Sequence, residues 1–126
     1  MENLIIESTN YTPQINFDYE IRILSITGKS YPENTFEFYT PVMEWIKNYM
    51  NIKTQEQTVV NIELAYLNSS SLKVFFDLFD LFETNVKDGH NIQLNWIFDE
   101  EDDVMEEMGE DFQEDFEDLK INFISK

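Results

Sequence analysis

The sequence contains no cysteine and only one histidine. Without cysteine the chain forms no disulfide, no zinc–thiolate site and no catalytic thiol. A single histidine leaves no histidine pair for a metal, and we expect His90, which follows Gly89, to be an exposed turn residue rather than a general base. The glycine-containing motifs of nucleophile elbows, P-loops and dinucleotide-binding folds are also absent. These absences argue against an enzyme.

Long hydrophobic runs are missing as well. No apolar run approaches the roughly 20 residues that span a bilayer, and residues 1–7 lack the basic region and apolar core of a signal peptide. We therefore expect a cytoplasmic protein. The 126 residues are 42% hydrophobic and 15% aromatic, which predicts one domain, residues 1–126, with a substantial core.

Basic residues are scarce, and the net charge is −18. Segment 99–118 alone contains 13 Asp or Glu and no Lys or Arg, so the other residues account for only −5 of that charge. Such a balance disfavours direct binding to nucleic acid or to an anionic membrane. The run Asp99–Asp103 lacks the glycine of an EF-hand loop, and we interpret it as at most a weak, non-specific cation-binding segment. We expect the protein to have no cofactor.

The hydrophobic pattern predicts an N-terminal β-hairpin followed by helices and strands in alternation. The expected strands are Leu4–Ile6, Ile15–Phe17, Ile21–Ile26, Thr58–Leu67, Ile92–Phe98 and Leu119–Ile124. Helices are expected from Asn34 or Thr40 to Met50, over Leu72–Val86 and over the acidic segment, with a loop at Gly28–Pro32. This order predicts an α/β fold: a mixed, mostly parallel sheet with about three helices packed on it.

Helical periodicity also predicts which side chains face the core. The expected core positions are Phe36, Tyr39, Met43, Ile46 and Met50 in the first helix, Phe75, Phe76, Phe79, Phe82 and Val86 in the second, and Val104, Met108, Phe112 and Phe116 in the third. In the second helix Val74, Leu78 and Leu81 widen the apolar arc beyond one core contact. Either the helix is sandwiched between sheet and neighbouring helix, or it exposes an apolar strip to a partner.

Three serines, Ser69 to Ser71, occupy the junction between a strand and this second helix. Free backbone N–H groups and the positive end of a helix dipole meet there. One cap is expected for stability alone, and Asn68, Ser69 and Ser70 are all suitable. Three successive hydroxyls exceed that need, so a phosphate acceptor is the alternative interpretation.

Several blocks of the sequence resemble the SiaC family of small regulatory phosphoproteins. They are Ser30–Asn34 (SYPEN), Phe36–Phe38, Pro41, Trp45–Ile46, Tyr66–Lys73 (YLNSSSLK) and Asp80–Glu83, in the family order over nearly the whole chain. The resemblance implies a fold similar to STAS domains. It also implies phosphorylation by a partner kinase, dephosphorylation by a PP2C-type phosphatase and, in the unphosphorylated form, activation of a diguanylate cyclase that promotes biofilm formation through cyclic di-GMP.

By the same resemblance the phosphoacceptor is the residue after the YLN motif, here Ser69, with Asn68, Ser70, Ser71 and Lys73 around it. The leading hypothesis is thus a non-enzymatic, phosphorylation-switched signalling module. Its expected partner contacts on the second helix are Val74, Asp77, Leu78 and Leu81. The alternative hypothesis is a constitutive acidic adaptor or nucleic-acid mimic that binds a basic partner through the 99–118 helix.

Overall fold

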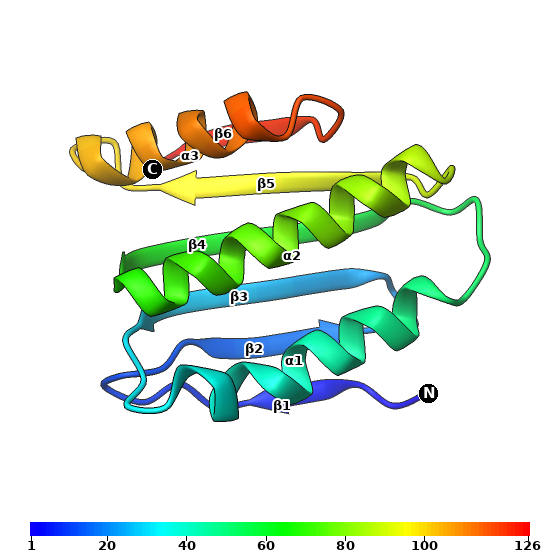
Figure 1. Cartoon of the computed structure of the whole chain (residues 1–126), viewed down its shortest axis with the longest axis horizontal. Helices are drawn as coiled ribbons and strands as arrows, with labels where there is room; N and C mark the ends of the chain where they lie inside the picture. Colours follow the sequence, from blue (N-terminus) through cyan, green and yellow to red (C-terminus); the bar gives the residue numbers. More distant parts are fainter.

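The computed structural model describes residues 1–126 and contains a six-stranded sheet with three helices packed on it (Figure 1). The strands are β1 (Leu4–Ile6), β2 (Gln14–Asp18), β3 (Ile23–Ser30), β4 (Thr58–Leu67), β5 (Ile92–Phe98) and β6 (Ile121–Ser125). The helices are α1 (Thr35–Met50), α2 (Ser69–Lys87) and α3 (Asp103–Asp115). The predicted fold class and order of elements are confirmed. None of the helices is long and apolar enough to cross a lipid bilayer.

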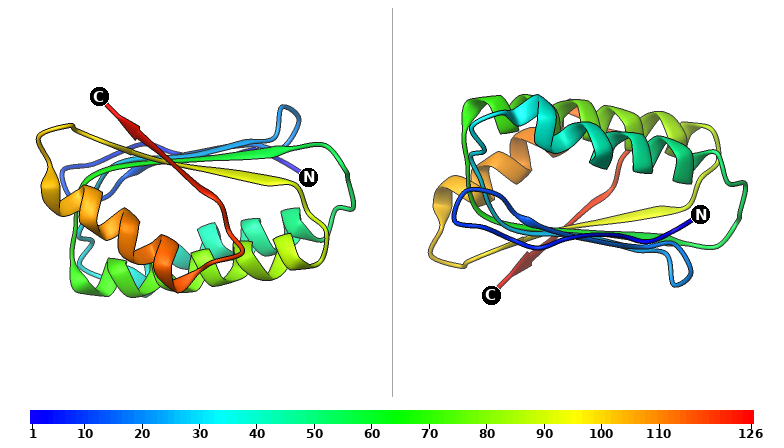
Figure 2. Two further views of the ribbon diagram at one scale, coloured as in Figure 1. Left: turned by 90° about the horizontal axis from the view of Figure 1, so that it is seen from above. Right: turned by 90° about the horizontal axis from the view of Figure 1, so that it is seen from below.

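The strands lie in the sheet in the order in which they occur in the sequence. β1, β2 and β3 pair antiparallel, whereas β3 to β6 pair parallel and are joined through the helices. Because strand–helix–strand crossovers are right-handed and the sheet always grows in one direction, all three helices fall on the same face, as Figure 2 shows. The order of the strands never reverses, so the fold has no topological switch point of the kind that forms nucleotide-binding crevices.

β3 is longer than the sequence pattern predicts. The expected loop at Gly28–Pro32 instead continues the strand through Ser30, which pairs with Leu67 of β4. An irregularity in the pairing between Gly28 and Lys29 allows this, and Gly28 adopts φ +128°, which only glycine reaches without strain. The prediction was wrong because partner strands, rather than local propensity, decide where a strand ends.

The core lies between the sheet and the single layer of helices. Three of the expected core residues face solvent instead: Phe36 is 82% exposed, Phe76 45% and Val104 69%. In α1 the predicted core residues Tyr39, Ile46 and Met50 are buried. Val42 is buried as well, whereas the predicted Met43 is only half-buried. α1 begins at Thr35 with Asn34 as its N-cap and continues through Pro41, so the earlier of the two expected starts is the observed one.

The opposite face of the sheet carries a row of polar side chains. The register places Asn16, Ser25, Asn61, Asn95 and Asn122 side by side on five successive strands. The Asn95 amide donates to Asn61 Oδ1 at 2.8 Å and accepts from the Asn122 amide at 3.3 Å. The amides of Asn61, Asn95 and Asn122 thus satisfy one another across three strands, and the row itself carries no charge.

α3 packs on the sheet through a glycine. A β-carbon at Gly109 would lie 2.5 Å from Trp96 Cδ1 and 2.8 Å from Phe123 Cε1. The Trp96 ring cannot easily move away, because its Nε1 donates a hydrogen bond to the Met105 carbonyl at 2.8 Å. The buried face of α3 therefore consists of Met105, Gly109 and Phe112. In the first two turns the buried residues are Met105 and Gly109, each one position after the predicted Val104 and Met108.

This close contact makes Gly109→Ala a test of the packing. Alanine favours a helix, yet overpacking should dominate and lower the free energy of unfolding by about 1–3 kcal/mol. Urea denaturation measures this change. The matched control is Glu110→Ala on the exposed side of α3, which should change stability little. A Gly109→Ala protein at least as stable as the parent would contradict the packing described here.

Candidate functional site

The junction between β4 and α2 is built around Asn68. Its side-chain Oδ1 accepts the Ser71 N–H at 2.9 Å, and its own N–H donates to the Ser30 carbonyl at 2.9 Å. Asn68 is therefore the N-cap of α2, and the helix begins at Ser69, three residues earlier than predicted. All three serines lie in the first helical turn, where only one cap residue was needed.

Ser71 points inward and is fully buried together with Ser30 and Tyr39. Ser30 Oγ donates to Ser71 Oγ at 2.7 Å, so the Tyr39 hydroxyl donates its proton to Ser30. Burial raises the pKa of Tyr39 from 10.0 to about 12, although the hydrogen bonds from its neighbours partly offset the effect. This network joins β3, α1 and α2 beneath the junction. Ser71 is thus a structural residue that a modifying enzyme cannot reach.

Ser69 and Ser70, in contrast, are exposed. Their backbone N–H groups have no hydrogen-bond partner, as expected for the first residues of a helix. The first turn of α2 contains no acidic residue, whereas α1 and α3 carry Glu37 and Asp103 in theirs. A negative group added at this turn would therefore meet unpaired donors and the uncompensated positive end of the dipole.

The two exposed serines begin different rows along α2. Residues three or four apart share a helix face, so Ser69 is followed by Lys73 and Phe76 on the outward crest. Ser70 is instead followed by Val74, Asp77 and Leu81, which face α1. A phosphate on Ser69 would stand on the crest, one turn before the Lys73 ammonium.

A groove of about 580 Å³ lies between α1 and α2. It is lined by apolar side chains from both helices, Phe36, Tyr39, Met43, Val74 and Leu81, and by the polar side chains Thr40, Glu44, Lys47, Asp77, Asp80 and Thr84. Three of the four expected partner contacts, Val74, Asp77 and Leu81, thus line one concave surface. Leu78 does not, because it is 1% exposed and packs in the core. The expectation that Leu78 contacts a partner is wrong, since its side chain is buried in the core, whereas Val74 and Leu81 are half-buried.

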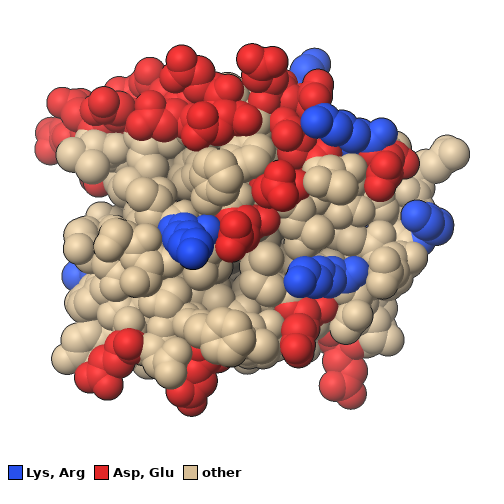
Figure 3. Space-filling view, viewed as in Figure 1, with Lys and Arg blue, Asp and Glu red and all other residues tan.

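The acidic segment is helical only over α3, and its ends form turns. Figure 3 shows carboxylates gathered along the edge of the molecule that α3 forms. Asp102 caps the helix by accepting the Met105 N–H at 3.1 Å. Asp103 and Glu106 suit the positive end of the helix dipole, but the last turn holds no basic residue. The carboxylates near that end are therefore not explained by helix stability.

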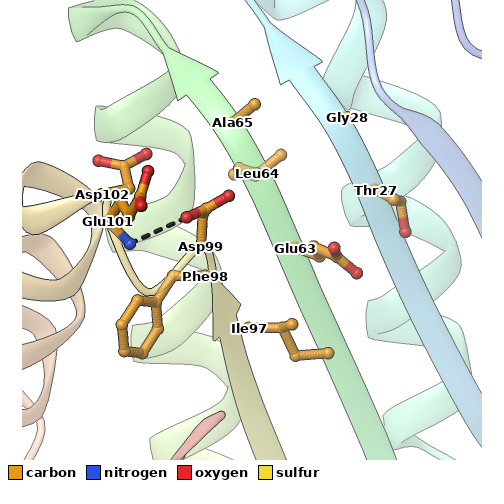
Figure 4. Close-up of a pocket in the computed structure, with 10 residues that line it drawn as sticks. All are labelled: Thr27, Gly28, Glu63, Leu64, Ala65, Ile97, Phe98, Asp99, Glu101 and Asp102. Atoms are coloured by element: carbon orange, nitrogen blue, oxygen red, sulfur yellow. Dashed lines mark hydrogen bonds between the residues drawn. The ribbon is translucent and has the colours of Figure 1, made fainter. Parts of the chain in front are cut away.

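A further hollow opens at the carboxyl ends of β3, β4 and β5 (Figure 4). Its carboxylates have local roles: Asp99 accepts the Glu101 N–H at 2.9 Å, and Glu63 pairs with Lys126 at 3.1 Å. No group of three or more acidic or histidine side chains in the structure is arranged to hold a metal ion. His90 lies half-buried in the turn after α2, and its N–H donates to the Asn85 carbonyl.

Comparison with known proteins agrees with this architecture. Residues 6–126 match the SiaC family of regulatory phosphoproteins. This chain belongs to the SiaC family. An uncharacterised protein of Pseudomonas aeruginosa strain UCBPP-PA14 is 35% identical over 115 residues, which is 91% of this chain and 90% of that protein.

Two solved structures from Pseudomonas aeruginosa are similar over the whole fold. One is the diguanylate cyclase SiaD in complex with its activator SiaC: the matched chain has a TM-score of 0.90 and 32% identity, with 98% of this chain and 99% of that chain covered. The other is SiaC alone, with a TM-score of 0.87, 32% identity and both chains covered completely. The family and fold expected from the sequence blocks are thereby confirmed.

Two parts of the site were not predicted from the sequence. One is the hydroxyl network, because Ser30 lies 41 residues before Ser71 and was assigned to a loop. The other is the contribution of α1 to the groove through Phe36 and Met43. Phe36 lies in the first turn of its helix, before the main core positions, and this placement was the sequence feature that could have indicated an exposed aromatic side chain.

The hydroxyl network gives a prediction about stability and pH. Tyr39→Phe removes the donor to Ser30 and should lower the free energy of unfolding by about 1–2 kcal/mol at neutral pH. Because the folded-state pKa of Tyr39 is raised to about 12, its stabilising effect is complete below pH 10 and is lost as pH rises toward 12. Urea denaturation between pH 7 and 12 should therefore show a shallower alkaline loss for the variant.

Tyr66→Phe serves as the control, because its exposed hydroxyl makes no hydrogen bond within the protein. It should leave both stability and its pH dependence unchanged. Equal behaviour of the Tyr39 and Tyr66 variants would contradict a stabilising role for the network.

Proposed function

We propose that this protein is a non-enzymatic signalling module that, in its unphosphorylated form, binds and activates a diguanylate cyclase. Phosphorylation of Ser69 by a partner kinase releases the cyclase, and a PP2C-type phosphatase reverses the modification. The observation that carries the proposal is the likeness to the SiaC chain that is complexed with SiaD, which extends over 98% of this chain. Cyclic di-GMP, and through it biofilm formation, is the output.

The local structure of α2 supports Ser69 as the acceptor. Its side chain is exposed, and the adjoining N–H groups are unpaired. Ser71 is buried, which removes one of the two competing serines. Ser70 is exposed, but it lies in the row that faces α1 and not on the crest of α2. A kinase that approaches from outside the helical layer therefore meets Ser69 first.

The α1–α2 groove and the adjoining crest of α2 supply the proposed contact surface for the cyclase. The groove offers an apolar floor from Met43, Val74 and Leu81, and Asp77 and Lys47 on its rim give polar contacts. Phe36, with its ring largely in solvent, provides the kind of aromatic anchor that contributes most to protein interfaces. Ser69 stands at the amino-terminal end of this surface.

The switch follows from charge and hydration. A phosphoserine adds about 1.5 to 2 negative charges, which the free N–H groups of the first turn tolerate in the isolated protein. Covering that dianion with an apolar partner surface costs several kcal/mol unless a cation pairs with it. Lys73 lies one turn away and is exposed, so it stabilises the phosphorylated free form but does not remove the penalty of burial.

Charge substitutions at Ser69 test the switch. Ser69→Asp should weaken binding to the cyclase at least tenfold, which corresponds to about 1.4 kcal/mol, because a carboxylate carries part of the phosphate charge. Ser69→Ala should keep full affinity and stay active in the presence of the kinase. Calorimetric titration with the cyclase and measurement of cyclic di-GMP formation give both results.

The matched control is Ser8→Asp, which adds the same charge at an exposed serine in the loop between β1 and β2. Circular dichroism verifies that each variant is folded. If folded Ser69→Asp protein binds the cyclase as tightly as Ser8→Asp protein, the proposed release mechanism is wrong. Mass spectrometry of protein isolated from its native cells should also locate a single phosphate on Ser69.

Truncation of Phe36 tests the contact surface. Phe36→Ala should reduce cyclase affinity at least tenfold, with little change in stability because the ring is not part of the core. Ile5→Ala removes an exposed apolar side chain from β1 and should leave the affinity unchanged. Equal affinities of the two variants would place the cyclase outside the α1–α2 groove.

A further inference from the structure

A second apolar groove lies on the other side of α2, between α2 and α3. Its volume is about 380 Å³, and its apolar lining consists of Leu72, Phe76, Val104, Met108 and Phe112. Leu72 is 38% exposed, Phe76 45% and Val104 69%, although each would be expected in a core by residue type. Large apolar side chains that gather in one exposed groove are typical of interaction sites.

The α3 side of this groove is lined with carboxylates. Glu107, Asp111 and Asp115 line it together with the apolar residues, at spacings of four. None of the three forms a salt bridge within the protein. Asp111 and Asp115 also lie toward the carboxyl end of α3, where the helix dipole disfavours negative charge. The α2–α3 groove thus combines an apolar floor with unpaired negative charge that does not stabilise its own helix.

We propose that the α2–α3 groove is a docking site for a cationic amphipathic helix of a protein partner. Apolar residues recur at spacings of four on both walls, as Leu72 and Phe76 on α2 and as Val104, Met108 and Phe112 on α3. Two to three helical turns of the partner fit such a length, with apolar anchors in the groove and Lys or Arg against α3.

The negative charge of the α2–α3 groove determines which class of ligand can bind there. A second copy of the chain carries the same net charge of −18 and would be repelled from the acidic edge. Nucleic acids and anionic lipids are repelled for the same reason. A free cation would satisfy the carboxylates but leave the apolar floor uncovered. Only an occupant that is both basic and apolar complements both parts of the groove.

The groove is separate from the surface proposed for the cyclase, and the inference does not depend on the phosphorylation switch. Leu72 and Phe76 lie on the α3 side of the α2 crest, whereas Val74 and Leu81 lie on the α1 side. The protein therefore presents two apolar grooves, and only the α2–α3 groove is bordered by the acidic helix (Figure 3).

The test uses the full chain and a fluorescein-labelled amphipathic helical peptide of Lys and Leu as the probe. Binding is followed by fluorescence anisotropy in about 0.1 M salt, where charges act over about 10 Å. The double variant Phe76→Ser, Val104→Ser should weaken peptide binding at least tenfold. Its control, Phe36→Ser, alters the other groove and should leave peptide binding unchanged. Circular dichroism confirms that all variants are folded.

A second pair of variants separates the groove from general attraction to an acidic helix. The first triple variant neutralises the groove side of α3 and carries Glu107→Gln, Asp111→Asn and Asp115→Asn. The second neutralises the same number of charges on the outer side of α3 and carries Glu106→Gln, Glu110→Gln and Glu114→Gln. The first triple should weaken binding of the Lys–Leu peptide at least tenfold more than the second. Equal losses would overturn the proposal in favour of non-specific attraction.

Two further outcomes would also overturn it. One is equally tight binding of a Glu–Leu peptide of the same pattern, because the acidic wall should repel that peptide. The other is loss of peptide binding in Phe36→Ser but not in the Phe76 and Val104 variant. Ser69→Asp should bind the Lys–Leu peptide at least as well as the parent, which distinguishes a failure of this inference from a failure of the phosphorylation switch.

Discussion

The hydrogen bonds made by Ser30 hold together the end of the protein where β3, α1 and α2 meet. The carbonyl of Ser30 accepts the Asn68 N–H, and its hydroxyl connects Tyr39 of α1 with Ser71 of α2. One residue at the end of β3 therefore fixes the point where α2 begins and the distance between α1 and α2. Because Ser71 is anchored inward, the helical rotation turns Ser69 outward onto the crest of α2. The buried hydroxyls thus determine which serine is presented.

The arrangement of the sheet explains why the surface of the helical layer is the natural place for partners. All crossovers turn the same way, so the helices form one layer, and the other face of the sheet is closed by a row of mutually bonded amides. No switch-point crevice forms in this sheet, because the order of its strands never reverses. What remains for recognition is the outer surface of three neighbouring helices and the grooves between them.

α2 divides that surface into two parts with different chemistry. Toward α1 the groove is apolar with both acidic and basic side chains on its rim, whereas toward α3 the charged side chains are all acidic. Ser69 lies on the crest between the two grooves. Under the proposed function, a phosphate there would act in opposite senses on partners bound on the two sides. The phosphate would weaken the contact with an apolar partner in the α1–α2 groove, and it would add an attractive negative charge beside a cationic partner in the α2–α3 groove.

The amino-acid pattern was enough to predict the family, the α/β class, the order of the elements and the location of the serine cluster. Strands β4 and β5 were predicted to their end residues, because both are apolar-rich segments with strand periodicity that are bounded by polar residues. Period-two and period-3.6 patterns of apolar residues arise from local geometry and are visible in a single sequence. The acidic character of one edge was equally clear from composition.

Which residues of those elements are accessible to solvent depends on how the elements pack against one another. The apolar residues Leu78 and Phe76 look equivalent in the sequence, yet one is buried and the other is exposed. Gly109 has no side chain to signal that its backbone touches Trp96, and Ser71 looks like its two exposed neighbours until Ser30 is placed beside it. In each case the deciding contact comes from a distant part of the chain, and burial is a property of the packed elements rather than of the residue type.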